Sequence, residues 1–569
     1  MMADQAKTNQ MTGAEAMVRM LEAHGVKTIF GLCGDTTLPF YDALYRLDHD
    51  IEHILTRDER SAAYMADGYA RLTNKVGVCE GPSGGGATYI VPGVVEANES
   101  SSAVLAITSD VATTSIGHYP LTELDQTTLF KPLTKWNAVI PRSEMVPDLV
   151  RQAFRSMTTG RPGAAHLGFP IDVQRGSVAA DGVWADDAHK RFPAKPNAPD
   201  WTDVERAVAA LLSAKNPVVI CGGGVVIAGA EPDLDQLATR LDLVVATTVS
   251  GQGSLADTHP NCLGVVGSNG GVVQTRAAVE AADLVVFIGC RAGSVTTERW
   301  RYPAKGTRIL HIDCDPDVIG ASYETEVALV GDAKLVLQAI NAVLDTHGDL
   351  PSEVGGAQTV SRLKAEKQSV FEALATSDDT PIKPERLIAE MQKTLPPDAV
   401  VIADPGTPCP YVSAYLEQDT PGRRILSNRA HGALGYSLSA AMGAHVGRPD
   451  LKVVSLMGDG SFGFTCGELE TVIRKKMPIT FIVVSNAVYG WIKAGQRSSF
   501  EERYYSVDFS RTDHAAVAAA FGVKSWKVED PAELGKVLKQ AFEHDGPTLV
   551  DVISQPLNEA NAPVSEWIA

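Results

Sequence analysis

The chain has 569 residues, of which 44% are hydrophobic and 21% charged, as is typical of a globular protein with three to four domains. Its formal net charge of −19 argues against nucleic acid or an anionic membrane as partner, and no apolar run is long enough to cross a bilayer. The eight cysteines form no CxxC pair and Met1–Gln10 is polar, so we expect a cytoplasmic protein with reduced thiols and no zinc site.

Strands alternate with helices in three blocks, which we assign to domains at residues 11–178, 200–345 and 381–569. This alternation predicts an α/β fold made of three doubly wound parallel sheets. In the first block, the sequence Thr12-Gly13-Ala14-Glu15 has the pattern of a capping box, which predicts a helix that stops near Gly25.

An acidic residue follows a predicted strand of the first block. The apolar run 51–55 predicts a strand, and the segment 56–71 continues as a helix with Glu59 in its first turn. An acid at this position is favoured by the helix dipole alone. Glu59 is therefore either an ordinary first-turn acid or a functional group at a strand-to-helix junction.

The middle block carries a Gly-rich turn after the predicted strand 217–221. Glycines in this position suit a pyrophosphate, an arginine could pair with one of its charges, and aspartates could meet a ribose or an adenine. The candidate residues are Gly222, Gly223, Arg291, Asp313 and Asp332. A Gly-rich turn after a strand is also often only a turn.

In the third block, two apolar runs that predict strands, 453–457 and 479–484, are each followed by an oxygen ligand. Asp459 follows the first run, and Asn486 follows the second, 27 positions further along. Adjacent parallel strands would bring a carboxylate and an amide oxygen to one point, which suits Mg²⁺. A helix predicted at 466–476 would place its N-terminal amides near Gly460 and Ser461, where a phosphate could bind.

Together these motifs resemble the thiamine-diphosphate enzyme family, in its acetolactate synthase, pyruvate oxidase and 2-oxo acid decarboxylase group. The resemblance rests on Gly458-Asp459-Gly460-Ser461 with Asn486, on the helix that carries Glu59, and on the Gly-rich turn and small-residue helix of 430–444. It extends over nearly the whole chain, from the segment 30–35 to the segment 489–493.

The resemblance implies a role for individual residues. Glu59 would bond the pyrimidine ring nitrogen and favour its imino form, Leu434 would fold the cofactor into a V shape, and the Gly432 carbonyl would accept from the exocyclic amine. Mg²⁺ would be held by Asp459, Asn486 and the Val488 carbonyl. The other residues expected at the diphosphate are Gly406, Thr407, Gly458, Gly460 and Ser461.

The family also implies an assembly and a second ligand. Its two half-sites come from different subunits, so we expect a homodimer or a dimer of dimers, that is, a homotetramer. The middle domain resembles one that holds flavin or ADP, and flavin, ADP or an empty site stay open for this chain.

The substrate is less well defined than the cofactor. Amino-acid-forming acetolactate synthases have an arginine where this chain has Val295 and a tryptophan where it has Gly495, which counts against the biosynthetic enzyme. Pyruvate oxidases have an acidic pair where this chain has Ala494-Gly495, so the match to the oxidases is also imperfect. We therefore expect an acetolactate synthase-like carbon–carbon lyase or carboligase, a transferase or lyase that acts on a 2-oxo acid.

Three residues are expected at the mouth of the thiazolium pocket, namely Asp35, Trp491 and Lys493. Asp35 would act there as a base or repel a carboxylate, or it only caps a turn. Lys493 would pair with an anionic substrate, or it is a solvated surface lysine.

Three alternatives to the carboligase remain. One is a pyruvate oxidase-like enzyme. Another is a 2-hydroxyacyl-CoA lyase acting on an acyl-CoA, although this chain has Leu121 where oxalyl-CoA decarboxylase-like proteins have a tyrosine, before Glu123. The third, from a different class, is a non-catalytic assembly or regulatory paralogue. The presence of Glu59, Asp459 and Asn486 together argues against it, because a degenerate copy would have no reason to keep all three.

Overall fold

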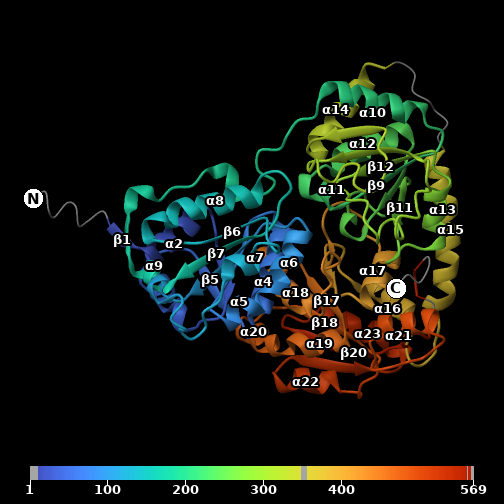
Figure 1. Cartoon of the computed structure of the whole chain (residues 1–569). Helices are drawn as coiled ribbons and strands as arrows, with labels where there is room; N and C mark the ends of the chain where they lie inside the picture. The colour runs from blue at the N-terminus through green and yellow to red at the C-terminus, as the bar shows by residue number, and fades with distance from the viewer. Residues whose placement is uncertain (1–9, 348–354, 561, 565–569) are drawn as a thin grey trace, which may run out of the picture. The chain divides into compact units, whose positions relative to one another are not determined.

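The computed structural model describes residues 10–347, 355–560 and 562–564. It contains three six-stranded sheets in which every strand pair is parallel, with helices around each sheet (Figure 1). The predicted α/β fold with three parallel sheets is therefore confirmed. Among the described residues, no helix combines the length and the apolar character needed to span a membrane.

The first sheet has the strand order β3-β2-β4-β5-β7-β6. Its strands are β2 (Thr28–Gly31), β3 (Glu52–Leu55), β4 (Gly77–Gly81), β5 (Val104–Asp110), β6 (Trp136–Val139) and β7 (Ala165–Pro170). The helices between Gly13 and Arg175 are α2 (Gly13–Ala23), α3 (Leu38–Arg46), α4 (Glu59–Thr73), α5 (Gly85–Tyr89), α6 (Val91–Glu99), α7 (Gln126–Phe130), α8 (Val146–Thr158) and α9 (Ile171–Arg175). Thr12 and Glu15 form the predicted capping box of α2. A short antiparallel pair, β1 (Gln10–Thr12) and β8 (Ser177–Ala179), lies outside this sheet.

The middle sheet has the order β11-β10-β9-β12-β13-β14. Its strands are β9 (Pro217–Cys221), β10 (Val244–Thr247), β11 (Cys262–Val265), β12 (Leu284–Ile288), β13 (Arg308–Asp313) and β14 (Val327–Val330). Its helices are α10 (Trp201–Ser213), α11 (Gly223–Ala228), α12 (Glu231–Leu241), α13 (Val273–Glu280), α14 (Ala333–Asp345) and α15 (Gly356–Ala375).

Alternating residues of β9 explain why helices cover both faces of the middle sheet. Val219 belongs to a buried cluster with α10, α12 and α14, whereas Val218 and Ile220 belong to another with α13 and α15. Because successive strand residues point to opposite faces, an unbroken apolar strand requires cover on both sides. The doubly wound arrangement follows from that pattern.

The third sheet has the order β16-β15-β17-β18-β20-β19. Its strands are β15 (Val400–Ala403), β16 (Ile425–Ser427), β17 (Val453–Gly458), β18 (Thr480–Ser485), β19 (Lys524–Val528) and β20 (Thr548–Ile553). The helices of this part of the sequence are α16 (Pro384–Thr394), α17 (Pro408–Tyr415), α18 (Tyr436–Gly447), α19 (Asp459–Thr465), α20 (Leu469–Arg474), α21 (Gly490–Ser499), α22 (His514–Ala520) and α23 (Pro531–Phe542).

The first and third sheets share one topology. Numbered from their own first strand, both have the order 2-1-3-4-6-5. In such sheets, ligands bind beyond the carboxyl ends of the strands where the order reverses, which is between strands 1 and 3. In the third sheet, this switch point lies between β15 and β17, directly before Gly406 and Asp459.

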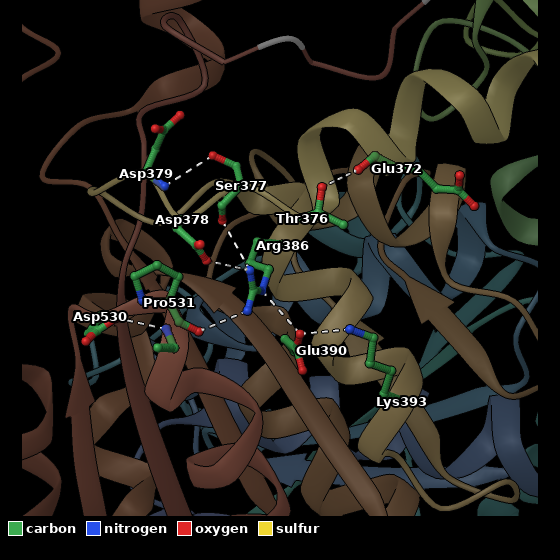
Figure 2. Close-up of polar contacts among 11 residues, drawn as sticks. Glu372, Thr376, Ser377, Asp378, Asp379, Arg386, Glu390, Lys393, Asp530 and Pro531 are labelled. Carbon is green, nitrogen blue, oxygen red and sulfur yellow. Dashed lines mark hydrogen bonds and ion pairs between the residues drawn. The ribbon is translucent and has the colours of Figure 1, made fainter.

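A polar cluster ties α16 to the start of α23 (Figure 2). The Arg386 guanidinium donates to the carbonyls of Ser377 and Pro531, at 3.3 and 3.4 Å, and to the Asp378 carboxylate at 3.2 Å. It also pairs with Glu390, one turn further along α16. One side chain thus joins the segment after α15, helix α16 and helix α23 at one edge of the hydrophobic layer that these helices form.

The chain divides into two compact units that are discontinuous in sequence. The first comprises residues up to Lys195 together with the segments 430–450 and 465–475, which contain α18 and α20. The second comprises the middle sheet and the third sheet.

The helix predicted at 466–476 is wrong in its start. Helix α19 begins at Asp459, a short 3₁₀ turn follows at Cys466–Glu468, and α20 covers only Leu469–Arg474. Asp459 favours this early start because its own carboxylate accepts from the Gly460 N–H in the first turn. Gly460 and Ser461 therefore lie inside the first turn of a helix instead of before one.

Candidate active site

Asp459 and Asn486 come together at the carboxyl ends of β17 and β18, as predicted. One oxygen of the Asp459 carboxylate accepts from the backbone N–H groups of Asn486 and Ala487, at 2.8 and 2.6 Å. Burial raises the pKa of Asp459, and the three backbone donors oppose that effect. A buried carboxylate at the start of α19 and an amide side chain on the loop after β18 thus lie at adjacent strand ends, and both are ligand types that suit Mg²⁺.

The loop after β18 is a tight turn with a strained residue. Ala487 has φ of 57°, in the left-handed region, and the Val488 N–H donates to the Asn486 side-chain oxygen at 3.3 Å. This hydrogen bond holds the backbone of Val488, the third predicted magnesium ligand, close to the Asn486 side chain. Because the turn is held by Asp459, one carboxylate organises the whole predicted ligand set.

A buried network that sequence reasoning missed supports this turn from behind. The Ser485 hydroxyl donates to the Asp551 carboxylate and lies 2.9 Å from Nδ1 of His514. The backbone N–H of His514 donates to the other Asp551 oxygen at 3.0 Å. Ser485 ends β18, His514 starts α22 and Asp551 lies on β20. The network therefore fixes Ser485, the residue just before Asn486. The signal available in the sequence was a polar residue within each of two mostly apolar strands, Ser485 in β18 and Asp551 in β20.

Open space lies beside two glycines at the ends of the strands that flank the switch point of the third sheet. Gly406 follows β15 and Gly458 ends β17. A Cβ atom built on Gly406 or Gly458 would meet nothing within 4 Å, and Gly406 has φ of 93°. Thr407 is buried, and its hydroxyl would lie 3.3 Å from a Cβ built on Gly490. By contrast, a Cβ on Gly460 would lie 2.7 Å from the Tyr489 ring. The backbone is therefore accessible to a diphosphate at Gly406 and Gly458.

Glu59 is the first residue of α4 and is only 7% exposed. The side chain of Asp58, the N-cap, accepts from the Arg60 N–H, so the helix start does not need the Glu59 carboxylate. Burial raises the pKa of Glu59, the hydrogen bond from its own backbone N–H opposes that effect, and the negative charges of Asp58 and Glu80 add to it. A buried acid of raised pKa is suited to giving a proton to a ring nitrogen.

Two glycines make room for the Glu59 side chain. A Cβ on Gly81 would lie 3.2 Å from the Glu59 Cγ, and one on Gly86 would lie 3.1 Å from its Oε1. Gly81 ends β4 and Gly86 is in α5, so the acid lies over the carboxyl end of the strand next to the switch point of the first sheet. These residues fit the pyrimidine-binding role that the sequence predicts.

A second buried acid near Glu59 was not predicted. Glu80 is 1% exposed, accepts from the Tyr41 hydroxyl at 2.5 Å, and lies 3.1 Å from Nε2 of His53. Its side chain occupies the space beside Gly31, where a Cβ would lie 2.1 Å from its Oε1. A charged residue inside the apolar strand 77–81 was the signal in the sequence.

The predicted wedge and amine acceptor lie on one turn before α18. Gly432 has φ of 78°, and Gly435, the N-cap residue of α18, has φ of 85°, so both adopt a left-handed conformation that suits glycine. Leu434 between them is half-buried. The two glycines are therefore needed for the left-handed backbone at these positions, and this backbone sets the orientation of the residues between them.

The three residues predicted at the pocket mouth have different surroundings. Asp35 is exposed at the start of a 3₁₀ turn, whereas Trp491 packs against the hydrophobic core of the third sheet. The Lys493 ammonium donates to Asp508 at 2.7 Å and lies 5.0 Å from the centre of the Tyr504 ring. Their part in substrate choice stays a prediction.

Packing and capping account for most candidates of the middle domain. A Cβ on Gly222 would lie 2.1 Å from the Gly289 carbonyl, so the turn after β9 packs directly on the end of β12. Asp332 caps α14 and Asp313 accepts from the Asp315 N–H, while Arg291 is exposed. Gly223 starts α11 at the switch point between β9 and β12. A flavin or ADP there stays a prediction.

Two α/β sheets share one topology, one with a buried acid and one with a carboxylate and amide pair at its switch point, and this arrangement suits a metal ion and a diphosphate cofactor. Three family models match the chain. They are "Thiamine pyrophosphate enzyme, N-terminal TPP binding domain" at residues 11–129, "central domain" at 204–340 and "C-terminal TPP binding domain" at 404–552.

Curated relatives match along almost the whole chain. A probable acetolactate synthase large subunit of Methanococcus aeolicus is 35% identical over 558 residues, which cover 96% of this chain and 92% of that protein. The acetolactate synthase of Mycobacterium bovis is 31% identical, covering 96% and 88%. The acetolactate synthase isozyme 3 large subunit of Escherichia coli is 30% identical, covering 94% and 92%. The chain belongs to the thiamine pyrophosphate enzyme family, and the predicted family is confirmed.

Proposed function

We propose that this chain is a Mg²⁺- and thiamine-diphosphate-dependent carboligase of the acetolactate synthase type. It would decarboxylate a 2-oxo acid and join the remaining fragment to an acceptor carbonyl. The observation that carries the proposal is the contact of the Asp459 carboxylate with the Asn486 loop, in a chain similar to acetolactate synthases along its length. When bound, thiamine diphosphate supplies a thiazolium that accepts the electrons left by decarboxylation.

The residues of the chain bind and activate this cofactor. Asp459, Asn486 and the Val488 carbonyl would give oxygen ligands to the metal ion, and the open backbone at Gly406 and Gly458 would admit the diphosphate. The buried Glu59 would hold a proton and donate it to the pyrimidine ring nitrogen. Each site would combine groups from two subunits of a homodimer.

We further propose that the acceptor differs from that of the amino-acid-forming enzymes. This rests on Val295 and Gly495, where those enzymes carry an arginine and a tryptophan. Gly495 lies in α21, and a Cβ there would meet nothing within 4 Å. A wider acceptor region, without the arginine that helps to hold a second 2-oxo acid, favours a neutral or bulkier acceptor.

The test is product formation from a panel of 2-oxo acids, alone and with aldehyde or 2-oxo acid acceptors, with thiamine diphosphate and Mg²⁺ added. We expect carbon dioxide release and a ligated product by mass spectrometry. Asp459→Ala should lose the cofactor on gel filtration, whereas the exposed Asp419→Ala should keep it. No turnover of any donor, or stoichiometric cofactor retained by Asp459→Ala, would refute the proposal.

A further inference from the structure

Glu96 is a completely buried carboxylate on α6, and it is not one of the residues that the family motif assigns to the cofactor. Its exposed fraction is 0%. One oxygen, Oε1, accepts from the Arg71 guanidinium at 2.8 Å and from the Ser100 hydroxyl at 2.7 Å. A buried charge is costly unless it is paired and hydrogen-bonded, and these two contacts satisfy half of the group.

The other oxygen of Glu96 holds the turn that precedes α18. Oε2 accepts from the backbone N–H groups of His431 and Gly432, at 2.7 and 3.2 Å, across more than 330 positions of sequence. Two successive N–H groups, which flank the His431 Cα, converge on one oxygen, and the left-handed conformation of Gly432 turns the chain directly after them. The carboxylate therefore fixes the direction of the Gly432 peptide.

Arg71 anchors Glu96 to the two helices that flank it. Its guanidinium also pairs with Asp67 at 2.9 Å, one turn earlier on α4. Asp67 in turn accepts from the Tyr436 hydroxyl, in the first turn of α18, at 2.7 Å. The buried network thus spans α4, α6 and α18, and it holds Glu96 in one orientation.

The same turn is held at its other end. The Thr465 hydroxyl donates to the Gly435 carbonyl at 3.2 Å. Between the two anchors lie the Gly432 carbonyl and Leu434, with only Ala433 separating them. Neither anchor touches those two groups directly, so the anchors define the direction of the backbone and leave the groups free to meet a ligand.

We propose that Glu96 is a positioning residue that holds the turn 431–435 in the orientation needed to receive the pyrimidine half of the cofactor. The proposal rests on the proposed function, because it assigns the Gly432 carbonyl and Leu434 to that ligand. Glu96 contacts main-chain N–H groups, Arg71 and Ser100, so it acts through the turn.

The test is Glu96→Gln, with Glu99→Gln on the same helix as the matched control. A glutamine amide can accept from the turn only if its NH₂ faces Arg71, donor against donor, so one set of contacts is lost in either orientation. In the protein without cofactor, amide hydrogen exchange of a peptide containing His431 and Gly432 should accelerate by about tenfold or more. The control should exchange at the wild-type rate.

The cofactor gives an independent readout. The dissociation constant for thiamine diphosphate with Mg²⁺, followed by tryptophan fluorescence, should rise by about tenfold or more in Glu96→Gln. Glu96→Asp keeps the charge next to Arg71 but is too short for both sets of contacts, so it should fold even if glutamine does not and should show the same acceleration.

Unchanged exchange at 431–432 in a folded variant would overturn the proposal. Faster exchange with unchanged cofactor affinity would overturn the positioning role, because the turn would then not matter for the ligand. Failure of the wild-type protein to bind thiamine diphosphate would refute the proposed function itself, and the exchange result would then identify Glu96 as a structural anchor alone.

Discussion

At the scale of single residues, the site depends on acids that are buried for different reasons. Asp459 accepts from three backbone N–H groups, Glu96 from a guanidinium, a hydroxyl and a turn, and Glu59 from one backbone N–H, its own. A buried carboxyl with fewer donors is held closer to its neutral form. This difference separates the acid suited to proton transfer from those suited to holding a loop or a metal ion.

The first prediction concerns Glu59→Gln. Glutamine keeps the size and one hydrogen bond but cannot give the proton, so turnover should fall by about 100-fold or more. The melting temperature should stay at the wild-type value, because Asp58 caps α4. Steady-state rates with saturating cofactor measure the effect, and a wild-type rate would place the enzyme outside this route of activation.

The second prediction concerns the acid next to it. Burial is the larger cause of the raised pKa of Glu59, and the charge of Glu80 adds to it. Glu80→Gln should therefore lower the pKa of Glu59, so that the proton is lost at lower pH and the alkaline limb of the pH–rate profile moves to lower pH. The exposed Glu144→Gln is the control. An unmoved alkaline limb in a folded Glu80→Gln protein would show that the two acids are not coupled.

At the scale of elements, α4 and α18 approach so closely that only glycine fits between them. A Cβ on Gly443 would lie 1.8 Å from the Met65 carbonyl, and one on Gly68 would lie 2.3 Å from the Ala440 carbonyl. Two glycines, one on each helix, thus face the backbone of the partner helix. This contact explains why the segment 436–447 is rich in small residues.

The third prediction follows from this contact. Gly443→Ala should destabilise the protein by about 3 kcal/mol or more, because the added methyl group meets backbone that cannot move away. Gly495→Ala, in α21, has open space and should be neutral or stabilising by up to about 1 kcal/mol. Thermal unfolding of the two variants compares them. Equal melting temperatures would mean that the helices can separate at little cost.

The fourth prediction concerns the start of α16, where burial raises the pKa of Glu385 to about 7. The folded protein thus holds this proton more tightly than the unfolded chain does. Stability from this group is present at low pH and is lost as pH rises from about 4.5 to about 7.

Glu385→Gln stays neutral, so it should gain about 2 kcal/mol over wild type between pH 5 and pH 8. The control is Glu372→Gln on α15, whose side chain is exposed. Chemical denaturation at the two pH values measures the difference. A variant whose advantage does not grow with pH would show that Glu385 is ionised at both values.

The sequence predicted the elements better than the contacts between them. The strand Pro217–Cys221 and the capping box of α2 are confirmed. Both could be predicted because they depend on residues close together in the sequence. The meeting of Asp459 and Asn486 was predictable because adjacent parallel strands end at one edge. The partners Glu96 and His514 were not, because each acts on a turn far away in sequence. The helix start at Asp459 was missed because a side chain accepting from its own first turn leaves no spacing pattern.

At the scale of the whole molecule, the fifth prediction concerns how the sites are shared. Glu59 belongs to the first sheet's block and Asp459 to the third, and we propose that each site takes them from different subunits. Glu59→Gln alone should keep about 1% of the wild-type activity or less, and Asp459→Ala alone should have none. A heterodimer of the two should have one doubly damaged site and one intact site, and recover about half of the wild-type activity.

Isolation of the heterodimer through two different affinity tags allows the measurement on a defined species. Its matched control is a heterodimer of wild type with the double variant, in which each site is damaged once and activity should be lost. A fully inactive heterodimer of the two single variants would show that both groups come from one chain or that the two sites cannot work independently.

The discontinuous first unit has a consequence for how the protein is made. Residues up to 195 leave the ribosome before the segment 430–450 that completes the same unit, with about 235 residues in between. At about 5 to 20 residues per second, this delay lasts on the order of 10 to 50 seconds. During that time, the face of α4 around Gly68 has no helix against it. The nascent chain therefore presents, for tens of seconds, the uncovered face of a helix that is buried in the folded protein. A protein whose translation stops before residue 430 keeps that face uncovered, as a substrate for chaperones and proteases.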